Sequence, residues 1–217
     1  MKTERKVTKR GFIGLAAIAC AAALGIAALT AAPEGRAQGA AADTETAVFA
    51  GGCFWCVEEA FDEVTGVVET VSGYTGGHVE NPTYEQVSGK STGHKEAVRV
   101  RYDPARASYA DLLDVFWRNV DPFDPHGQFC DKGDSYKSAI FVEGEAQRKL
   151  AEASKQAVEK RFGQPVATEV EPASAFWPAE DYHQDYHNTN PLAYKFYKWN
   201  CGRAQRLQEV WGPAKQS

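Results

Sequence analysis

Two cysteines in the stretch GGCFWC, residues 51–56, are the side chains in this sequence best suited to chemistry. Cys53 follows two glycines and stands at the expected first turn of a helix. Unpaired N–H groups and the positive end of the helix dipole lower the pKa of a thiol there, so that thiolate is available at neutral pH. A buried and inert cysteine is the alternative. Cys56 completes a C-x-x-C spacing, which is typical of thiol–disulfide exchange pairs and of zinc sites.

A zinc site would need further ligands, and His183 and His187 offer an H-x3-H spacing. The gap of 126 residues between Cys56 and His183 is far longer than the spacing in a zinc finger. Gln184 stands where a metalloprotease helix carries glutamate. Aromatic packing or a solvated face explains both histidines better, and we predict no metal site.

The two aromatic residues between the cysteines differ in their expected roles. Phe54 falls on the apolar face of the helix, in line with Val57 and Phe61, and packing in the core is its simplest role. Trp55 lies off that face. It is a better candidate for the wall of an apolar pocket that is open to substrate.

Strands and helices that position these residues can be predicted along the chain. Gly51 and Gly52 allow a tight turn between the first strand and the helix that follows. We predict strands at 45–50, 67–74, 96–103, 138–143 and 167–173, helices at 53–64, 108–120 and 144–163, a short helical turn after Pro82, and an aromatic-rich segment after 173. This order indicates one α+β domain over residues 45–212. Its expected core is a ferredoxin-like split βαββαβ unit, with a mixed, mainly antiparallel sheet and flanking helices.

The first 37 residues have the layout of an export signal. Five basic residues among the first ten precede an uncharged, alanine-rich run at 12–32. We predict cleavage after Ala37, a flexible lead-in at 38–44, a tail at 213–217, and export to the periplasm by either the Sec or the twin-arginine route. The apolar run could instead stay uncleaved as a membrane anchor. A third possibility is that Cys20 is lipidated.

Composition narrows the possible functions of the exported form. Removal of residues 1–37 would leave 18 basic and 27 acidic residues, a net charge of −9. An acidic protein repels phosphate backbones, which argues against nucleic acid as a partner. Four cysteines would remain, an even number that suits an oxidising compartment. Met1 is the only methionine. A protein that handles oxidants or oxidised methionine is less easily damaged by oxidation if it contains no methionine of its own.

Several longer motifs occur in a fixed order along the chain. They are GCFW at 52–55, GYTGG at 73–77, NPTYEQV at 81–87, TGHKEAVRVRYDP at 92–104, LLDVFWRNVDP at 112–122, YKSAI at 136–140, FWPAEDYHQDY at 176–186 and NP at 190–191. Together they resemble the peptide methionine sulfoxide reductases of the A type. The resemblance runs from about Ala47 to Trp211, and several long motifs in register make it specific.

The resemblance implies a reaction and assigns residues to it. Cys53 would attack the sulfoxide sulfur as thiolate and become a sulfenic acid, while methionine leaves. Glu96, kept protonated by desolvation, would give a proton to the sulfoxide oxygen. Tyr84 and Tyr136 would hydrogen-bond this oxygen, and Asp131 matches the active-site aspartate of the family. Without the resemblance, Glu96 would be taken for a solvent-facing strand residue.

The resemblance also implies a methyl-binding pocket and a second thiol. Phe54 and Trp55 would hold the methyl group of the substrate. The sulfenic acid would condense with another cysteine, and we rank the candidates Cys56, Cys201 and Cys130; two of the three could also form a structural pair. The chain departs from the commonest family pattern in having Cys56 after GCFW, where glycine is usual. It also reads QFCDKGDSY at 128–136 around the aspartate.

The family acts on the S epimer of methionine sulfoxide, free or in proteins, and needs no metal or organic cofactor. A thioredoxin-like dithiol would reduce the resulting disulfide. We therefore predict a monomeric repair enzyme for oxidised exported proteins. Two alternatives of other classes are a disulfide-exchange protein that uses Cys53 and Cys56 on partners, and a metal-binding domain that combines cysteines with His183 and His187.

Overall fold

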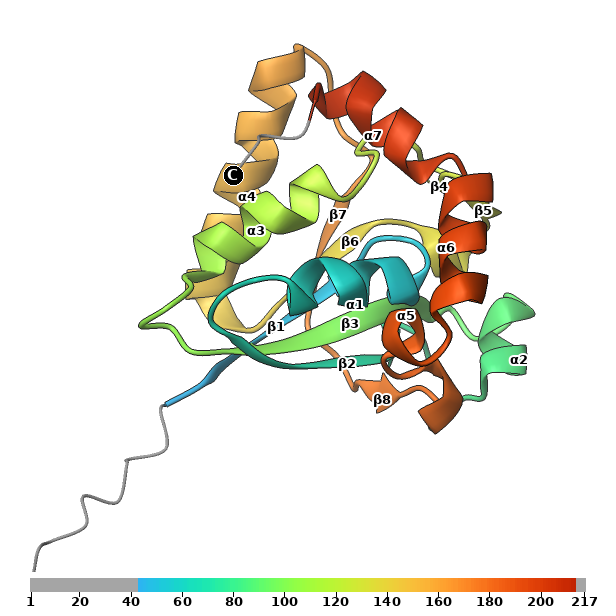
Figure 1. Cartoon of the computed structure of the whole chain (residues 1–217). Coiled ribbons are helices and arrows are strands. Elements are labelled where there is room, and N and C mark those ends of the chain that lie inside the picture. Colours follow the sequence, from blue (N-terminus) through green and yellow to red (C-terminus); the bar gives the residue numbers. More distant parts are fainter. Residues whose placement is uncertain (1–42, 214–217) are drawn as a thin grey trace, which may run out of the picture. The chain divides into compact units, whose positions relative to one another are not determined.

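The computed structural model describes residues 43–213, so the predicted export signal and most of the lead-in lie outside the described residues. Six strands form one sheet in the order β7-β6-β1-β3-β2-β8 (Figure 1). Their bounds are β1 Glu45–Ala50, β2 Val67–Thr75, β3 Lys95–Tyr102, β6 Ala139–Val142, β7 Glu169–Pro172 and β8 Trp177–Pro178.

The centre of the sheet has the predicted split βαββαβ topology. Strand β3 pairs antiparallel with both β1 and β2, and β1 also pairs antiparallel with β6. Helix α1 (Phe54–Asp62) connects β1 to β2, and α3 (Tyr109–Arg118) lies between β3 and β6. Strand β7 extends the sheet in parallel with β6, which makes the sheet mixed. The predicted fold class is confirmed.

The two faces of the sheet bury different residues. Along β1, Ala47 and Phe49 belong to the main core, whereas Val48 and Ala50 belong to a smaller core on the opposite face. This alternation follows from the two-residue repeat of a strand. Helices α1, α3 and α4 (Gly144–Phe162) bury their apolar residues in the main core. The face of the sheet that carries α1 therefore also carries most of the helical layer.

The C-terminal region is the main departure from the predicted elements. The segment expected only to be aromatic-rich forms three helices, α5 (Tyr186–Thr189), α6 (Pro191–Asn200) and α7 (Arg203–Trp211), and in Figure 1 α5 lies beside one end of α1, with α6 next to α5. Helix α6 carries large aromatic residues on both its buried and its exposed sides, so its sequence has no clear apolar stripe. Within residues 43–213, no helix is long and apolar enough to cross a membrane.

Three short elements complete the frame of the site. Helix α2 (Tyr84–Ser88) confirms the predicted turn after Pro82, and Thr83 caps it by accepting a hydrogen bond from the Gln86 N–H. A hairpin of β4 (Gly127–Gln128) and β5 (Asp131–Lys132) and a 3-10 turn, η1 (Asp134–Tyr136), were not predicted.

Glu58, on the buried side of α1, leads to a prediction about stability. Its side chain is 1% exposed, and its Oε2 atom has no hydrogen-bond partner. Burial, aided by the negative charge of Asp62, raises the pKa of Glu58 to about 7. The folded state thus holds this proton more tightly than the unfolded state, so stability decreases as the pH rises from the unfolded pKa towards 7.

Replacing Glu58 with glutamine should therefore stabilise the protein above neutral pH. We expect an increase in the free energy of unfolding of about 2 kcal/mol at pH 8 and little change at pH 5. Urea denaturation at the two pH values measures it. Glu63→Gln, at an exposed residue just after the same helix, should change stability little at either pH. A Glu58→Gln protein that is less stable at pH 8 would contradict the prediction.

Candidate active site

Cys53 lies at the junction of β1 and α1, and the turn before it requires glycine. Gly52 has φ +85°, and a Cβ atom there would lie 2.6 Å from the Cβ of Gln128. Cys53 is the N-cap residue of α1, is 6% exposed, and accepts a hydrogen bond on its carbonyl from the Cys56 N–H at 3.1 Å. The two thiols therefore sit on one buried turn, as the C-x-x-C spacing predicts.

Glu96 reaches this turn from β3. Its Oε2 atom accepts a hydrogen bond from the Phe54 N–H at 3.1 Å, and the residue is 3% exposed. Burial raises the pKa of Glu96 to about 8; the negative charge of Asp131 adds to the effect, and hydrogen bonds from Phe54 and Tyr136 oppose it. A carboxyl group with this pKa is mostly protonated at neutral pH, as a proton donor must be.

The prediction that the helix N-terminus lowers the pKa of Cys53 is wrong for the substrate-free protein. The Phe54 N–H, which could have stabilised the sulfur, donates to Glu96 instead. Burial raises the pKa of Cys53, and the neighbouring Cys56 and Glu96 raise it further. A hydrogen bond from Cys53, together with the charges of Arg203 and Lys198, lowers the pKa of Cys56 to about 6. Of the two thiols, Cys56 is therefore the one whose surroundings favour ionisation.

Aromatic rings form the surroundings of Cys53. The His183 ring lies 5.0 Å from the Phe54 ring and 5.7 Å from the Trp55 ring, between ring centroids. Its Nδ1 atom accepts a hydrogen bond from the Trp55 indole N–H at 3.2 Å. The Tyr186 ring stacks on Trp55 with 3.8 Å between centroids. Phe54 and Trp55 thus lie together beside Cys53, as predicted, and the indole is held in place on several sides.

The two histidines pack and do not join the cysteines. Burial lowers the pKa of His183, which keeps its ring neutral among the aromatic side chains. The His187 Nε2 atom lies 3.4 Å from a carboxylate oxygen of Asp62. Within residues 43–213, the one group of three potential metal ligands is Cys130, Asp131 and Cys201, and two of these are joined by a disulfide. His183 thus has the aromatic packing role favoured by the sequence, whereas His187 lies beside Asp62.

Glu180 and Gln184 hold the segment with His183 against the sheet. Glu180 accepts hydrogen bonds from the Tyr74 hydroxyl and from the Tyr84 N–H at 2.9 and 2.8 Å. The Gln184 side chain accepts from the Ser72 N–H at 2.9 Å and donates to the Ser72 carbonyl at 3.0 Å. Sequence reasoning missed both residues, although they lie inside the motif FWPAEDYHQDY.

Tyr84 and Tyr136 approach Glu96 from α2 and η1. Burial raises the pKa of both tyrosines, the charge of Glu96 adds to this, and each tyrosine also affects the pKa of the other. Tyr136 in turn acts to lower the pKa of Glu96. Asp131 is the first residue of β5, and burial raises its pKa too. The structure therefore brings together the five side chains assigned to the reaction from the sequence.

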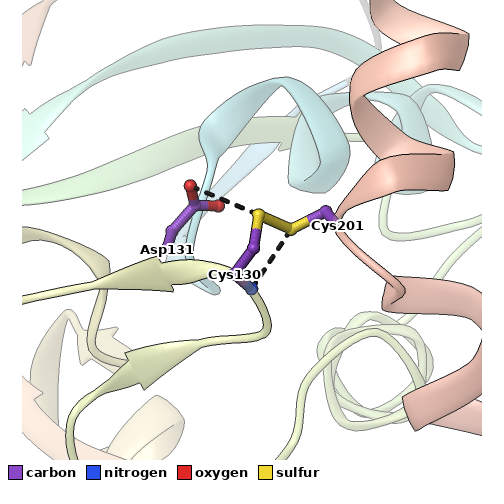
Figure 2. Close-up of side chains that lie close together, drawn as sticks. All are labelled: Cys130, Asp131 and Cys201. Atoms are coloured by element: carbon purple, nitrogen blue, oxygen red, sulfur yellow. Dashed lines mark hydrogen bonds between the residues drawn. A yellow bond between two sulfur atoms is a disulfide. The ribbon is translucent and has the colours of Figure 1, made fainter.

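Cys130 and Cys201 form a disulfide beside this group (Figure 2). Cys201 caps the C-terminal end of α6, and its Sγ atom accepts a hydrogen bond from the Cys130 N–H at 3.2 Å. Cys130 is exposed, whereas Cys53 and Cys56 are free and buried. The four cysteines of the described chain thus fall into an inner dithiol and an outer disulfide, a pairing that the sequence left open.

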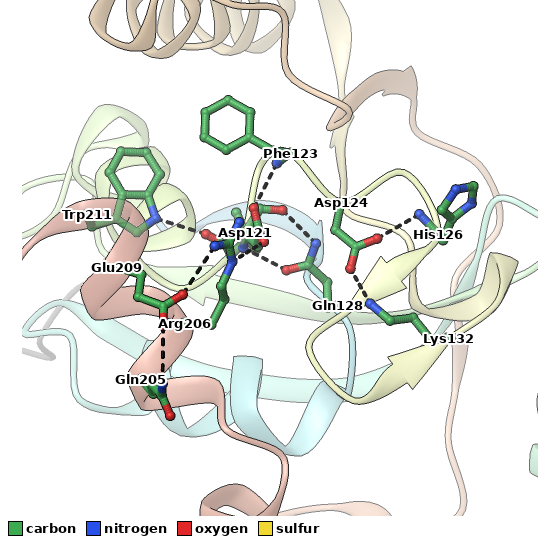
Figure 3. Close-up of polar contacts among 11 residues, drawn as sticks. Asp121, Phe123, Asp124, His126, Gln128, Lys132, Gln205, Arg206, Glu209 and Trp211 are labelled. Atoms are coloured by element: carbon green, nitrogen blue, oxygen red, sulfur yellow. Dashed lines mark hydrogen bonds and ion pairs between the residues drawn. The ribbon is translucent and has the colours of Figure 1, made fainter.

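The loop that carries Cys130 and Asp131 is anchored by polar contacts (Figure 3). The Gln128 side chain accepts from the Asp121 N–H and donates to the Asp121 carbonyl, both at 2.8 Å. The Arg206 Nε atom donates to the Asp121 carboxylate at 2.7 Å, and Lys132 pairs with Asp124. These contacts fix the β4–β5 hairpin against α7 and so hold the Asp131 side chain in its place.

Helix α6 closes the site from the outside. Its inward residues Tyr194 and Tyr197 hydrogen-bond Glu59 and Asp131, respectively. The Tyr197 ring also meets the Trp55 ring edge-on, 5.7 Å between centroids. Two cavities, of about 410 and 610 Å³, lie away from Cys53 and are lined by Arg118 and Trp211 among others. Neither tyrosine was predicted; their three-residue spacing, which places both on one face of α6, was the available signal.

Comparison with known proteins identifies the family. The family model described as peptide methionine sulfoxide reductase matches residues 45–215. This chain belongs to the peptide methionine sulfoxide reductase family. The reductase is 51% identical over 172 residues to peptide methionine sulfoxide reductase MsrA 2 of Rhizobium meliloti, covering 79% of this chain and 86% of that protein. It is 50% identical over 170 residues to MsrA of Bacillus licheniformis, covering 77% of this chain and 94% of that protein.

Solved structures agree with this assignment. The reductase resembles the reduced form of Mxr1 from Saccharomyces cerevisiae with a TM-score of 0.66 and 31% identity, over 70% of this chain and 88% of that one. It resembles methionine sulfoxide reductase A of Corynebacterium diphtheriae with a TM-score of 0.63 and 34% identity, over 71% and 78% of the two chains. The chain is therefore an A-type methionine sulfoxide reductase, an oxidoreductase, and the resemblance seen in the sequence is confirmed.

Proposed function

We propose that this reductase converts methionine S-sulfoxide, free or in proteins, to methionine through a sulfenic acid on Cys53. The observation that carries the proposal is the placement of a buried thiol next to a buried carboxyl group that is protonated at neutral pH. The Phe54 N–H, one residue from the sulfur, is hydrogen-bonded to this carboxyl group. The carboxyl group that donates the proton is thus bound to the backbone of the residue next to the nucleophile.

The first step moves two electrons from sulfur to sulfur. The Cys53 thiol transfers its proton to the Cys56 thiolate, and the resulting Cys53 thiolate attacks the sulfoxide sulfur. Glu96 protonates the sulfoxide oxygen, whose bond to sulfur breaks as that oxygen passes to Cys53. Methionine leaves as the thioether, and Cys53 becomes a sulfenic acid. Glu96 then regains a proton from the Cys56 thiol or from solvent.

The neighbouring side chains orient the substrate in this step. Tyr84 and Tyr136 hydrogen-bond the sulfoxide oxygen. Both tyrosines lie close to Glu96, which protonates the same oxygen. Phe54 and Trp55 pack against the methyl group. Asp131 accepts a hydrogen bond from Tyr197 and so connects α6 to the site.

Cys56 is the resolving cysteine in this scheme. Its thiolate attacks the Cys53 sulfenic sulfur, a disulfide forms, and the departing hydroxide takes a proton from Glu96 and leaves as water. Cys130 and Cys201 are already joined to each other, so neither is the first partner. Once they are reduced, these two cysteines can in turn reduce the inner disulfide by exchange. The exposed outer disulfide then offers a thioredoxin-like dithiol a sulfur that it can reach.

The proposed setting is the periplasm, where the enzyme repairs oxidised exported proteins as a monomer. The layout of residues 1–37 supports export. The electrons come from an external dithiol through four cysteines, so the scheme needs no metal or organic cofactor.

The experiment that tests this function uses the Cys56→Ser variant without any reductant. Incubated with methionine S-sulfoxide, it should form one equivalent of methionine per chain and retain a sulfenic acid on Cys53, which dimedone labels and mass spectrometry locates. The wild-type protein should form a Cys53–Cys56 disulfide instead. A protein that only exchanges disulfides with partners would form no methionine, which would refute the proposal.

A further inference from the structure

We propose that His183 is a positioning residue for the substrate pocket, because the hydrogen bond that it accepts from the Trp55 indole selects the orientation in which this indole faces the methyl group of the sulfoxide. This inference rests on the proposed function, since it concerns the same pocket. It adds to the aromatic packing of His183 a role in binding the substrate.

Trp55 is held by two kinds of contact, and they fix different things. The Tyr186 ring stacks on one face of the indole, with an interplanar angle of 9°. Stacking fixes the plane of the indole, but a rotation of about 180° about χ2 keeps that plane, and both orientations are accessible to such a torsion. The Trp55 N–H donates to the His183 Nδ1 atom at 3.2 Å. This bond distinguishes the two edges of the indole and therefore selects one of the two orientations.

His183 can orient the indole because its own position is fixed by the sheet. It is the last residue of the 3-10 turn η2 (Asp181–His183) and is 3% exposed. The side chain of the next residue, Gln184, accepts from the Ser72 N–H at 2.9 Å and donates to the Ser72 carbonyl at 3.0 Å. These two bonds attach the segment to β2. The acceptor for the Trp55 N–H is thus mounted on the sheet and not on α1.

The second ring nitrogen of His183 indicates that packing alone does not explain a histidine here. Burial lowers the pKa of His183, so the ring is neutral, and because Nδ1 accepts, the proton lies on Nε2. Within residues 43–213, this Nε2 atom is buried and has no hydrogen-bond partner. A buried donor without a partner lowers stability, and phenylalanine would pack among the same rings without that cost. The bond from Trp55 to Nδ1 is the contact that accounts for the histidine.

Loss of the acceptor should weaken substrate binding more than it slows the chemistry. The Trp55 N–H would be unpaired in its present orientation, so the indole should favour the other one. The orientation that suits the methyl group would become a minor state, and the apparent affinity for the sulfoxide would fall with its population. Cys53 and Glu96 do not take part in this change, so the rate with substrate bound should change little.

The test replaces His183 with asparagine or leucine in the Cys56→Ser protein and follows the first turnover at increasing concentrations of methionine S-sulfoxide. Both substitutes remove the ring and have the same branched shape, but only asparagine offers an acceptor near the former Nδ1 position. His183→Leu should raise the half-saturating concentration about 10-fold and change the rate at saturation by less than about 2-fold. His183→Asn should stay within about 3-fold of the parent in both values. His126→Leu, at an exposed position just before β4, should change neither.

A second comparison shows whether His183 acts through the indole. Trp55→Phe keeps an aromatic wall but has no N–H to orient. In that background His183→Leu should cause no further rise in the half-saturating concentration, because the two residues act as one unit. An equal rise with and without the indole would mean that His183 acts independently of Trp55, which would overturn the proposal.

The remaining outcomes separate this proposal from the proposed function. A Cys56→Ser parent that forms no methionine refutes the reaction itself. A parent that forms methionine while His183→Leu matches it, or while His183→Leu and His183→Asn lose affinity equally, overturns only the role of His183. A His183→Leu protein that is found unfolded in thermal denaturation also overturns that role, because the contact would then hold the fold and not the pocket.

Discussion

Replacing Cys53 with serine should abolish methionine sulfoxide reduction. We expect the steady-state rate with dithiothreitol to fall by at least about 10⁴-fold, because serine loses its proton far less readily than cysteine and cannot form a sulfenic acid. The change in volume is small, so the fold should survive. Methionine release measured by chromatography gives the rate, and dimedone labelling should find no sulfenic acid.

The Cys56→Ser protein is the matched comparison for this variant, because it removes the other thiol of the same turn. It should still produce methionine in a single turnover, whereas Cys53→Ser should produce none even at high protein concentration. If serine at position 53 left the single turnover intact, another sulfur would have to be the nucleophile. The scheme built on the inner dithiol would then be wrong.

The position of Cys53 could be predicted from local features of the sequence, because two glycines and a helix start place the thiol. Glu96 was identified only through the family resemblance, since the alternation of KEAVRVRY taken alone suggests a solvent-facing residue, whereas the side chain is buried. The motif order then assigned the roles of Tyr84, Tyr136 and Asp131. Each of these residues lies within a long motif, so its neighbours in the sequence identify it.

The charge on the thiol pair could not be predicted in the same way. The helix dipole argument considered only α1, but the N–H at its start is taken by a carboxyl group from β3, 42 residues away in the chain. Burial then opposes ionisation of Cys53, and Arg203 and Lys198 from the C-terminal helices favour ionisation of Cys56. The outcome depends on contacts between distant segments, which spacing along the chain does not reveal.

The role of the C-terminal region was missed for a related reason. Helix α6 presents Tyr194 inwards and Trp199 and Phe196 outwards, so polarity does not distinguish its two sides. The Cys130–Cys201 pairing joins residues 71 positions apart, and four cysteines allow three pairings. Only the folded arrangement of α6 against the β4–β5 hairpin selects one of them.

Glu96→Gln should have the second largest effect on activity. Glutamine keeps the size of the side chain, and its carbonyl can still accept the hydrogen bond from the Phe54 N–H. It cannot deliver a proton to the sulfoxide oxygen, so the first-turnover rate at pH 7 should fall about 10²- to 10⁴-fold. Glu152→Gln, at an exposed position on α4, should leave the rate unchanged.

The pH dependence separates the catalytic role of Glu96 from a structural one. With a pKa of about 8, the carboxyl group is protonated below that pH, so wild-type activity that depends on this proton should decline as the pH rises through 8. The low remaining rate of Glu96→Gln should lack this decline. A raised carboxyl pKa also means that stability is lost as the pH rises from the unfolded pKa to about 8, and glutamine removes that loss. The variant should thus be more stable than the wild type at pH 9 while being far less active. A variant that is both inactive and unstable at pH 9 would mean that Glu96 mainly holds the start of α1 in place.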